Sequence, residues 1–188
     1  MNASSLTILI AEDSATDRML LSTIVGRQGH RVLVAANGLE ALALFESQRP
    51  QLVLMDALMP VMDGFEAARR IKAMAGEAMV PIIFLTSMSE DEALVSCLEA
   101  GGDDFLAKPY SRVILEAKIN AMDRLRRLHQ EVLRQRDQIA RHNEHLQNEQ
   151  LVAKAVFDKV AHSGCLGSGN VRYLCLLYTS DAADDSLR

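Results

Sequence analysis

Five short apolar runs, separated by segments long enough for a helix, constrain the fold of this chain more than any other feature. The runs are 6–11, 31–35, 52–55, 80–85 and 103–107. Most are continuously apolar, as expected for strands of a parallel sheet that is buried on both faces. Helices are predicted at about 15–28, 38–48, 64–75 and 89–99, and a fifth begins near Ser111. The repeated strand–helix order predicts an α/β fold with a doubly wound parallel sheet.

Polar side chains follow four of these runs directly. Glu12 and Asp13 follow the first, Asp56 the third, Thr86 the fourth and Lys108 the fifth. Because the carboxyl ends of parallel strands meet at one edge of the sheet, we expect these side chains to converge. Crowded carboxylates need a counter-charge, and their oxygens favour a hard cation such as Mg²⁺. With a cation and a lysine present, one carboxylate can attack a phosphoryl donor and become an aspartyl phosphate.

These residues, together with the stretch LMPVMDG at 58–64 and with Pro109, resemble the receiver domain of two-component response regulators. The order and separations of the motifs match over about residues 5–123. The resemblance implies a CheY-like, flavodoxin-like fold, in which a five-stranded parallel sheet of strand order 2-1-3-4-5 is followed by a long α-helix. It also implies a cis peptide bond between Lys108 and Pro109.

The resemblance assigns roles at the acidic end of this group. Asp56 would be the phosphoacceptor. Asp13 and Asp56 would bind Mg²⁺ directly, with the backbone carbonyl of Leu58 as a third ligand, and Glu12 would act through a metal-bound water. Leu58 and Met88 stand at positions that flank the path of the hydrolytic water in the family. Neither side chain orients a water well, so we expect slow self-dephosphorylation.

Other residues are assigned to signalling by the same resemblance. Thr86 and Lys108 would sense the phosphoryl group, and Phe105 occupies the position of the family's switch aromatic. The face built by the fourth helix, the fifth strand and the fifth helix would be the switching surface. The implied function is phosphorelay signal transduction, with a sensor histidine kinase or a phosphotransfer protein as donor.

Residues 111–162 predict one long helix, because no Gly or Pro interrupts them. Residues 1–110 carry 8 basic and 15 acidic residues, whereas 111–160 carry 10 and 7. Acidic residues are interspersed among the arginines of this helix, so we expect a solvated face and no nucleic-acid surface. From residue 124 onward the arginines are Arg124, Arg126, Arg127, Arg134, Arg136 and Arg141.

Half of a coiled-coil seam can be read along this helix. With Leu125 as heptad position a, the a series is entirely apolar: Leu125, Val132, Ile139, Leu146, Ala153 and Val160. The d series is polar in its centre: Leu128, Gln135, His142, Glu149 and Val156. The pattern predicts a homodimer through 111–162 with a marginal seam. The alternative is a monomeric helix that packs on its own partner domain.

The sequence predicts four regions: a receiver domain at 1–123, a helical coiled-coil linker at 124–162, a stub of a truncated effector domain at 163–174 and a non-native tail at 175–188. Residues 149–160 and 170–174 resemble the entry to a phosphatase domain of the SpoIIE, PP2C-like type. Residues 175–185 resemble a reading-frame translation of a transposon-end sequencing adapter.

The expected function is that of a phosphoacceptor with no enzymatic activity beyond its own phosphorylation. One alternative is the regulatory half of a PP2C-like serine phosphatase whose catalytic domain is missing. Another is a binding module of the same fold that no longer accepts phosphate, against which the complete set of site residues argues. The first 30 residues lack a basic segment followed by a long apolar run, so we expect a cytoplasmic protein with no membrane partner.

Overall fold

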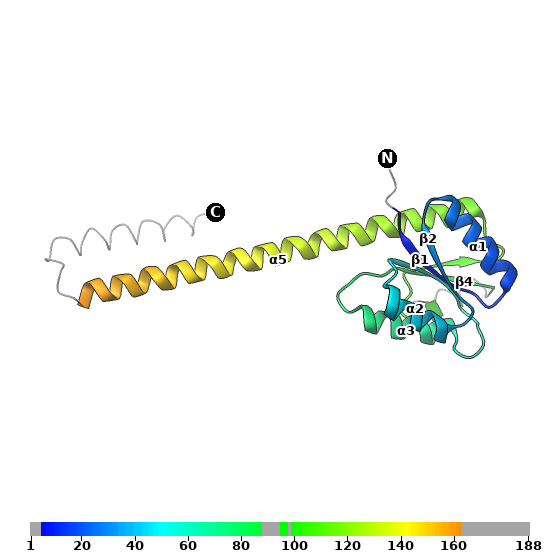
Figure 1. The fold of residues 1–188 in the computed structure, drawn as a ribbon, viewed down its shortest axis with the longest axis horizontal. Coiled ribbons are helices and arrows are strands. Elements are labelled where there is room, and N and C mark those ends of the chain that lie inside the picture. The colour runs from blue at the N-terminus through cyan, green and yellow to red at the C-terminus, as the bar shows by residue number, and fades with distance from the viewer. Residues whose placement is uncertain (1–4, 88–94, 98, 163–188) are drawn as a thin grey trace. The chain divides into compact units, whose positions relative to one another are not determined.

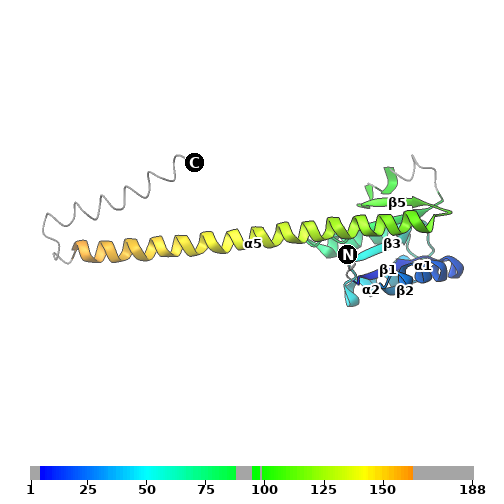
Figure 2. The ribbon, with the colours of Figure 1, turned by 90° about the horizontal axis from the view of Figure 1, so that it is seen from above.

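The computed structural model describes residues 5–87, 95–97 and 99–162. Five strands form one parallel sheet in the order β2-β1-β3-β4-β5. Their bounds are β1 Thr7–Ala11, β2 Arg31–Ala35, β3 Leu52–Asp56, β4 Ile82–Thr86 and β5 Asp104–Ala107. Figure 2 shows β5 and β2 at opposite edges, with β1 and β3 between them. The predicted doubly wound sheet and its strand order are confirmed.

The helices begin and end close to the predicted residues. They are α1 Ala15–Arg27, α2 Gly38–Gln48, α3 Gly64–Ala75 and α5 Arg112–His162. Three of them start at a residue whose side chain accepts a hydrogen bond from a backbone N–H of the first turn: Ser14, Asn37 and Asp63. Such caps satisfy donors that have no partner inside the helix. The predicted helix at 89–99 falls mostly outside the described residues.

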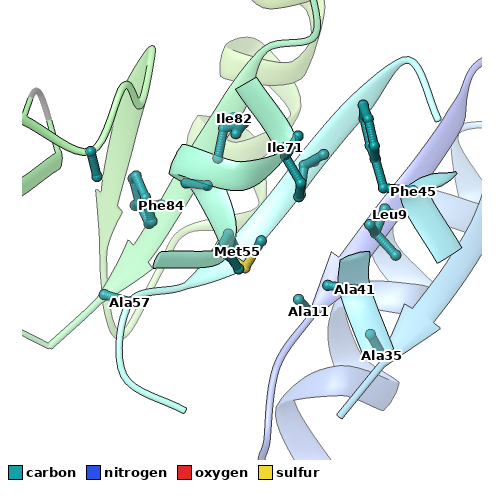
Figure 3. Close-up of a cluster of buried hydrophobic side chains, with 14 of the residues drawn as sticks. Leu9, Ala11, Ala35, Ala41, Phe45, Met55, Ala57, Ile71, Ile82 and Phe84 are labelled. Carbon is teal, nitrogen blue, oxygen red and sulfur yellow. The ribbon is translucent and has the colours of Figure 1, made fainter. Parts of the chain in front are cut away.

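Two apolar cores enclose the sheet, because alternate residues of each strand point to opposite faces. On one face, Leu9, Met55 and Phe84 pack against α2 and α3, which contribute Phe45 and Ile71 (Figure 3). On the other, strand residues pack against α1 and the first turns of α5: Ile8, Ile10, Leu54, Leu85, Leu21, Val25, Leu115 and Ile119. Figure 1 shows α1 on one side of the sheet, with α2 and α3 on the other.

The chain divides into two compact units, residues 1–133 and 134–188. Helix α5 begins in the first unit and continues into the second as one helix, which confirms the predicted long helix. The predicted boundary between receiver and linker therefore lies inside α5. The predicted effector stub at 163–174 and tail at 175–188 lie outside the described residues. None of the described helices is both long and apolar enough to cross a membrane.

A buried ion pair joins two successive turns within α5. Arg126 Nη2 lies 2.6 Å from Asp123 Oδ1, and both side chains are 8% exposed. The predicted solvated position of Arg126 is therefore wrong. The reason is geometric: Arg126 lies on the face of α5 that continues from Ile119 and Met122, which the domain covers. Interspersed charges in the sequence do not reveal which turns of a helix lie against a domain.

Candidate functional site

The carboxyl edge of the sheet brings together three acidic side chains. Glu12 and Asp13 directly follow β1, and Asp56 is the last residue of β3. Each offers one carboxylate oxygen, and these oxygens all lie within 4.8 Å of one another. Glu12 and Asp56 are buried, whereas Asp13 is exposed. The predicted convergence of the three acids is thus a property of the structure.

Lys108 supplies the cationic group that stands among these acids. Its Nζ atom donates hydrogen bonds to Glu12 Oε2 and to Asp56 Oδ2, each at 2.8 Å. The peptide bond to Pro109 is cis, as the resemblance implies. The Lys108 N–H also donates to the carbonyl oxygen of Thr86 at 2.7 Å, which ties the loop after β5 to the end of β4. Three carboxylates face one ammonium group, so the pocket has an excess of negative charge.

Burial and charge shift the pKa values of this pocket. Burial is the largest cause that raises the pKa of Glu12 to about 7; the hydrogen bond from Lys108 opposes it and the nearby Asp56 adds to it. Burial alone lowers the pKa of Lys108, but hydrogen bonds to Asp56 and Glu12 outweigh it and raise that pKa above its usual range. Lys108 is therefore a firmly protonated group, and the pKa of Glu12 lies near neutral pH.

Close backbone packing positions Asp56. The backbone N–H of Leu58 donates to Asp56 Oδ1 at 3.2 Å, and that of Gly64 donates to the carbonyl oxygen of Ala57 at 3.0 Å. A Cβ atom on Gly64 would lie 2.0 Å from the Asp56 carbonyl oxygen, so only glycine fits there. In the same loop Val61 has φ 70°, a conformation that is rare for a β-branched residue.

Arg18 is a site residue that the sequence analysis missed. Its Nη1 atom donates to the carbonyl oxygens of Glu12 and Asp13, at 2.6 and 3.0 Å. It thereby holds the turn that presents both acids. Its position was a usable signal, because a basic side chain near the start of a helix opposes the helix dipole and needs another partner.

Thr86 and Phe105 occupy the predicted places in the fold. Thr86 is the last residue of β4 and is 1% exposed. Phe105 lies in β5 beside Phe84 of β4 and packs against the core that α2 and α3 cover. The predicted switching roles of both residues remain predictions, as does the role of the Leu58 carbonyl. Met88 lies outside the described residues.

A shallow groove of about 330 Å³ adjoins Lys108. It is lined by Asp17, Leu20, Lys108, Pro109 and Tyr110. The Tyr110 hydroxyl is buried, and among the described residues it has no hydrogen-bond partner. Burial, assisted by the negative charge of Asp17, raises the pKa of Tyr110 to about 12.

The fold and this pocket together define a flavodoxin-like protein with an acidic, lysine-bearing pocket at the carboxyl edge of its sheet. Residues 8–120 match the model of the response regulator receiver domain. The chain belongs to the response regulator receiver family. The predicted resemblance is confirmed.

Curated relatives agree with this assignment. The chain is 41% identical over 115 residues to the transcriptional regulatory protein AfsQ1 of Streptomyces coelicolor, covering 61% of this chain and 50% of that protein. It is 36% identical to the protein PilH of Pseudomonas aeruginosa, covering 61% and 95%. The chain thus spans about half the length of several curated regulators it matches, AfsQ1 among them.

Solved structures give the same fold. The chemotaxis protein CheY4 of Vibrio cholerae superposes with a TM-score of 0.60 at 28% identity, covering 63% of this chain and 99% of that one. The receiver domain of a signal transduction histidine kinase from Syntrophus aciditrophicus superposes with a TM-score of 0.58 at 36% identity, covering 63% and 89%. Both likenesses are to receiver-type structures, and both leave about a third of this chain uncovered.

Proposed function

We propose that Asp56 accepts a phosphoryl group from the phosphohistidine of a sensor histidine kinase or phosphotransfer protein. The observation that carries this proposal is the convergence of Glu12, Asp13 and Asp56 with Lys108 at one sheet edge. A structural ion pair needs one acid for one lysine. Here two acids share one lysine and a third acid lies beside them, which leaves the pocket ready for a cation and a phosphoryl group.

The proposed step is an in-line displacement. An oxygen of the Asp56 carboxylate attacks phosphorus, and the new P–O bond forms as the bond to the donor nitrogen breaks. The imidazole leaves with the electron pair of the broken bond. Lys108, which already contacts Asp56 Oδ2 at 2.8 Å, is placed to pair with a phosphoryl oxygen. The hydroxyl of Thr86, at the end of the neighbouring strand, would donate a hydrogen bond to another phosphoryl oxygen and so report the arrival of the group.

The residues present fit a magnesium ion. Three carboxylate oxygens within 4.8 Å of one another form a hard-oxygen donor set, and two of the three acids are buried. We propose that Glu12, Asp13, Asp56 and the backbone carbonyl of Leu58 hold Mg²⁺ there. The ion would neutralise charge that develops on the transferred phosphoryl oxygens.

Signal output forms the last part of the proposal. Thr86 and Phe105 would couple phosphorylation to the surface around β5 and α5, and α5 would join two copies of the chain in a homodimer. The only chemistry that we propose for this chain is its own phosphorylation on Asp56, and we propose that it takes place in the cytoplasm. Any effector activity would belong to a longer protein. The chain's half-length match to regulators such as AfsQ1 supports a separate output region.

Phosphodonor labelling tests the acceptor directly. Wild-type protein, Asp56→Asn and Asp56→Ala are incubated with a small phosphodonor or a phosphorylated histidine kinase, with and without MgCl₂. We expect Mg²⁺-dependent label in the wild type and none in either variant. Asp63→Asn is the matched control, because Asp63 caps α3 and Asn caps a helix equally well. Unchanged labelling of both Asp56 variants would reject Asp56 as the acceptor.

A further inference from the structure

An apolar row runs along the part of α5 that the domain does not cover. In the first unit, the α5 side chains of Ile119, Met122 and Arg126 are buried. Leu125, Leu128 and Val132 point elsewhere and are 46%, 59% and 63% exposed. Side chains of this size are costly to leave in water, so the row marks a surface for another apolar partner.

The row continues at heptad spacing in the second unit. Ile139 is 61% exposed, Leu146 42% and Val156 57%. With Leu125 at position a, these residues fall at a, a and d, which is the seam of a two-stranded coiled coil. A globular partner does not require apolar residues at heptad spacing over several heptads. A second copy of α5 carries the same heptad spacing and therefore matches it.

We propose that α5 pairs with α5 of a second copy in a parallel, in-register coiled coil. The inference rests on the homodimer of the proposed function and fixes its orientation. In a parallel pair each seam residue faces its own counterpart, so the apolar a positions meet each other. The polar d positions Gln135, His142 and Glu149 then also meet each other.

An antiparallel pair is disfavoured by the same residues. Antiparallel helices place a positions against d positions, so Val132, Ile139 and Leu146 would face the polar side chains of the d series. Burying a polar group against an apolar one leaves its hydrogen bonds unmade. A parallel pair shifted by one heptad is disfavoured too, because Leu128 would then face Gln135.

Charges beside the seam favour the same register. In a parallel coil the g residue of one helix faces the e residue five positions further along the other helix. Glu131 at g therefore faces Arg136 at e of the second copy. Farther along, Val152 at g faces Phe157 at e, which extends the apolar surface. Glu149 faces its own counterpart, so the pairing is weaker in that layer.

Cysteine cross-linking tests the register in the 188-residue chain that carries Cys165→Ser and Cys175→Ser. Cys97 can stay, because it is 3% exposed and burial raises its pKa to about 11. We expect Ile139→Cys to form a disulfide-linked dimer under mild oxidation. Glu144→Cys, on the opposite side of the helix, is the control and should stay unlinked. Preferential linking of Ile139→Cys to His142→Cys in a mixture would mean an antiparallel pair and would overturn the inference.

A charge-reversal cycle gives an independent test. Positions 131 and 136 do not face each other on one helix, because only residues three or four apart do. Coupling between them therefore reports a neighbouring helix. We expect Glu131→Arg and Arg136→Glu each to weaken dimerisation, roughly threefold to thirtyfold for two exposed pairs, and the double variant to restore it. Failure of the double variant to restore dimerisation would contradict the proposed register.

Two further measurements separate this inference from the proposed function. Glu149→Leu should tighten the dimer at least several-fold, a gain that misfolding cannot produce. Labelling of Asp56 is measured in every variant. A protein that is labelled but does not cross-link would reject the parallel coiled coil and leave Asp56 as the phosphoacceptor. A protein that cross-links but is not labelled would reject Asp56 as the phosphoacceptor and leave the coiled coil. A monomer at all concentrations used would reject both the seam and the homodimer.

Discussion

Buried charges gather at both ends of the receiver sheet, and the two groups differ in how completely they are paired. At the amino-terminal edge, Asp123 pairs with Arg126 at 2.6 Å and with Arg127 at 2.9 Å. At the carboxyl edge, Glu12 and Asp56 share Lys108 while a third acid lies beside them. The first group is complete within the chain, whereas the second has more negative than positive charge.

This difference separates a structural charge group from a reaction site. A buried ion pair that is fully satisfied stabilises the element that carries it, here two turns of α5. A buried group with unbalanced charge is costly for folding, and it becomes useful when a cation and a phosphoryl group complete it. The predictions below perturb the two edges in matched pairs.

The largest effect is expected at Gly64, which supports the reactive edge. In Gly64→Ala the new Cβ atom would lie 2.0 Å from the Asp56 carbonyl oxygen, and backbone cannot yield as a flexible side chain can. We expect a loss on the order of 3 kcal/mol or more in the free energy of unfolding, measured by urea denaturation. Phosphorylation of Asp56 should fall with it.

Gly26→Ala is the matched control for that experiment. Gly26 lies inside α1, and nothing stands within 4 Å of the position that its Cβ would take. Alanine should therefore stabilise the protein by about 1 kcal/mol. Equal losses in the two variants would show that the close approach at Gly64 has no special role.

The second prediction compares the cations of the two charge groups, buried Arg126 and half-buried Lys108. Arg126→Met leaves Asp123 buried without its closest partner, and we expect a loss of roughly 3 kcal/mol in the free energy of unfolding. Added MgCl₂ should not restore it. Lys108→Met removes the counter-charge of the acidic pocket instead, so MgCl₂ should stabilise this variant more than it stabilises the wild type.

Thermal unfolding with and without MgCl₂ measures both effects. Labelling should be retained in Arg126→Met and strongly reduced in Lys108→Met. An equal Mg²⁺ response in the two variants would remove the distinction between a complete and an incomplete charge group.

The third prediction concerns pH and Glu12. Burial raises the folded-state pKa of Glu12 from 4.5 to about 7, so its contribution to stability is present below pH 4.5 and is lost as the pH rises through about 7. Glu12→Gln cannot titrate. In metal-free buffer the wild type should therefore lose stability relative to this variant across that window, with a slope of at most about 1.4 kcal/mol per pH unit.

Urea denaturation at several pH values with a chelator present gives the comparison. Adding MgCl₂ should flatten the wild-type curve, because a bound cation offsets the charge of ionised Glu12. If the wild type instead gained stability relative to Glu12→Gln as the pH rises, the folded pocket would favour the ionised form of Glu12.

The sequence was sufficient for the parts of the structure that follow from repeated patterns. Continuous apolar runs and their polar ends predicted the parallel sheet and the meeting of Glu12, Asp13, Asp56 and Lys108, whereas the strand order was implied by the family resemblance. These predictions succeed because a parallel sheet places all its carboxyl ends at one edge. No residue-by-residue packing knowledge is needed for that step.

The parts that escaped prediction depend on what one side chain contacts. Arg18 reaches back to two backbone carbonyls; its place in the first turns of α1 signals that it needs a partner but does not say which. Arg126 was expected in water, but it lies on a turn of α5 that the domain covers. The Tyr110 hydroxyl, which has no hydrogen-bond partner among the described residues, likewise depends on the exact shape of the loop after β5. Such features need three-dimensional packing, which a periodic pattern does not contain.

The smallest predicted effect concerns phosphoryl lifetime at the reactive edge. Leu58 lies two residues after Asp56, and its side chain is 59% exposed. An apolar side chain cannot hydrogen-bond a water that attacks the phosphoryl group, so the aspartyl phosphate should be long-lived. Leu58→Asn places an amide there, which can both donate and accept a hydrogen bond. We expect the variant to lose its label several-fold faster, as followed by decay of labelled protein after the donor is removed.

Leu58→Met, which keeps the site apolar, is the control, and its label should decay as that of the wild type does. A variant lifetime equal to that of the wild type would show that water is oriented by groups other than residue 58.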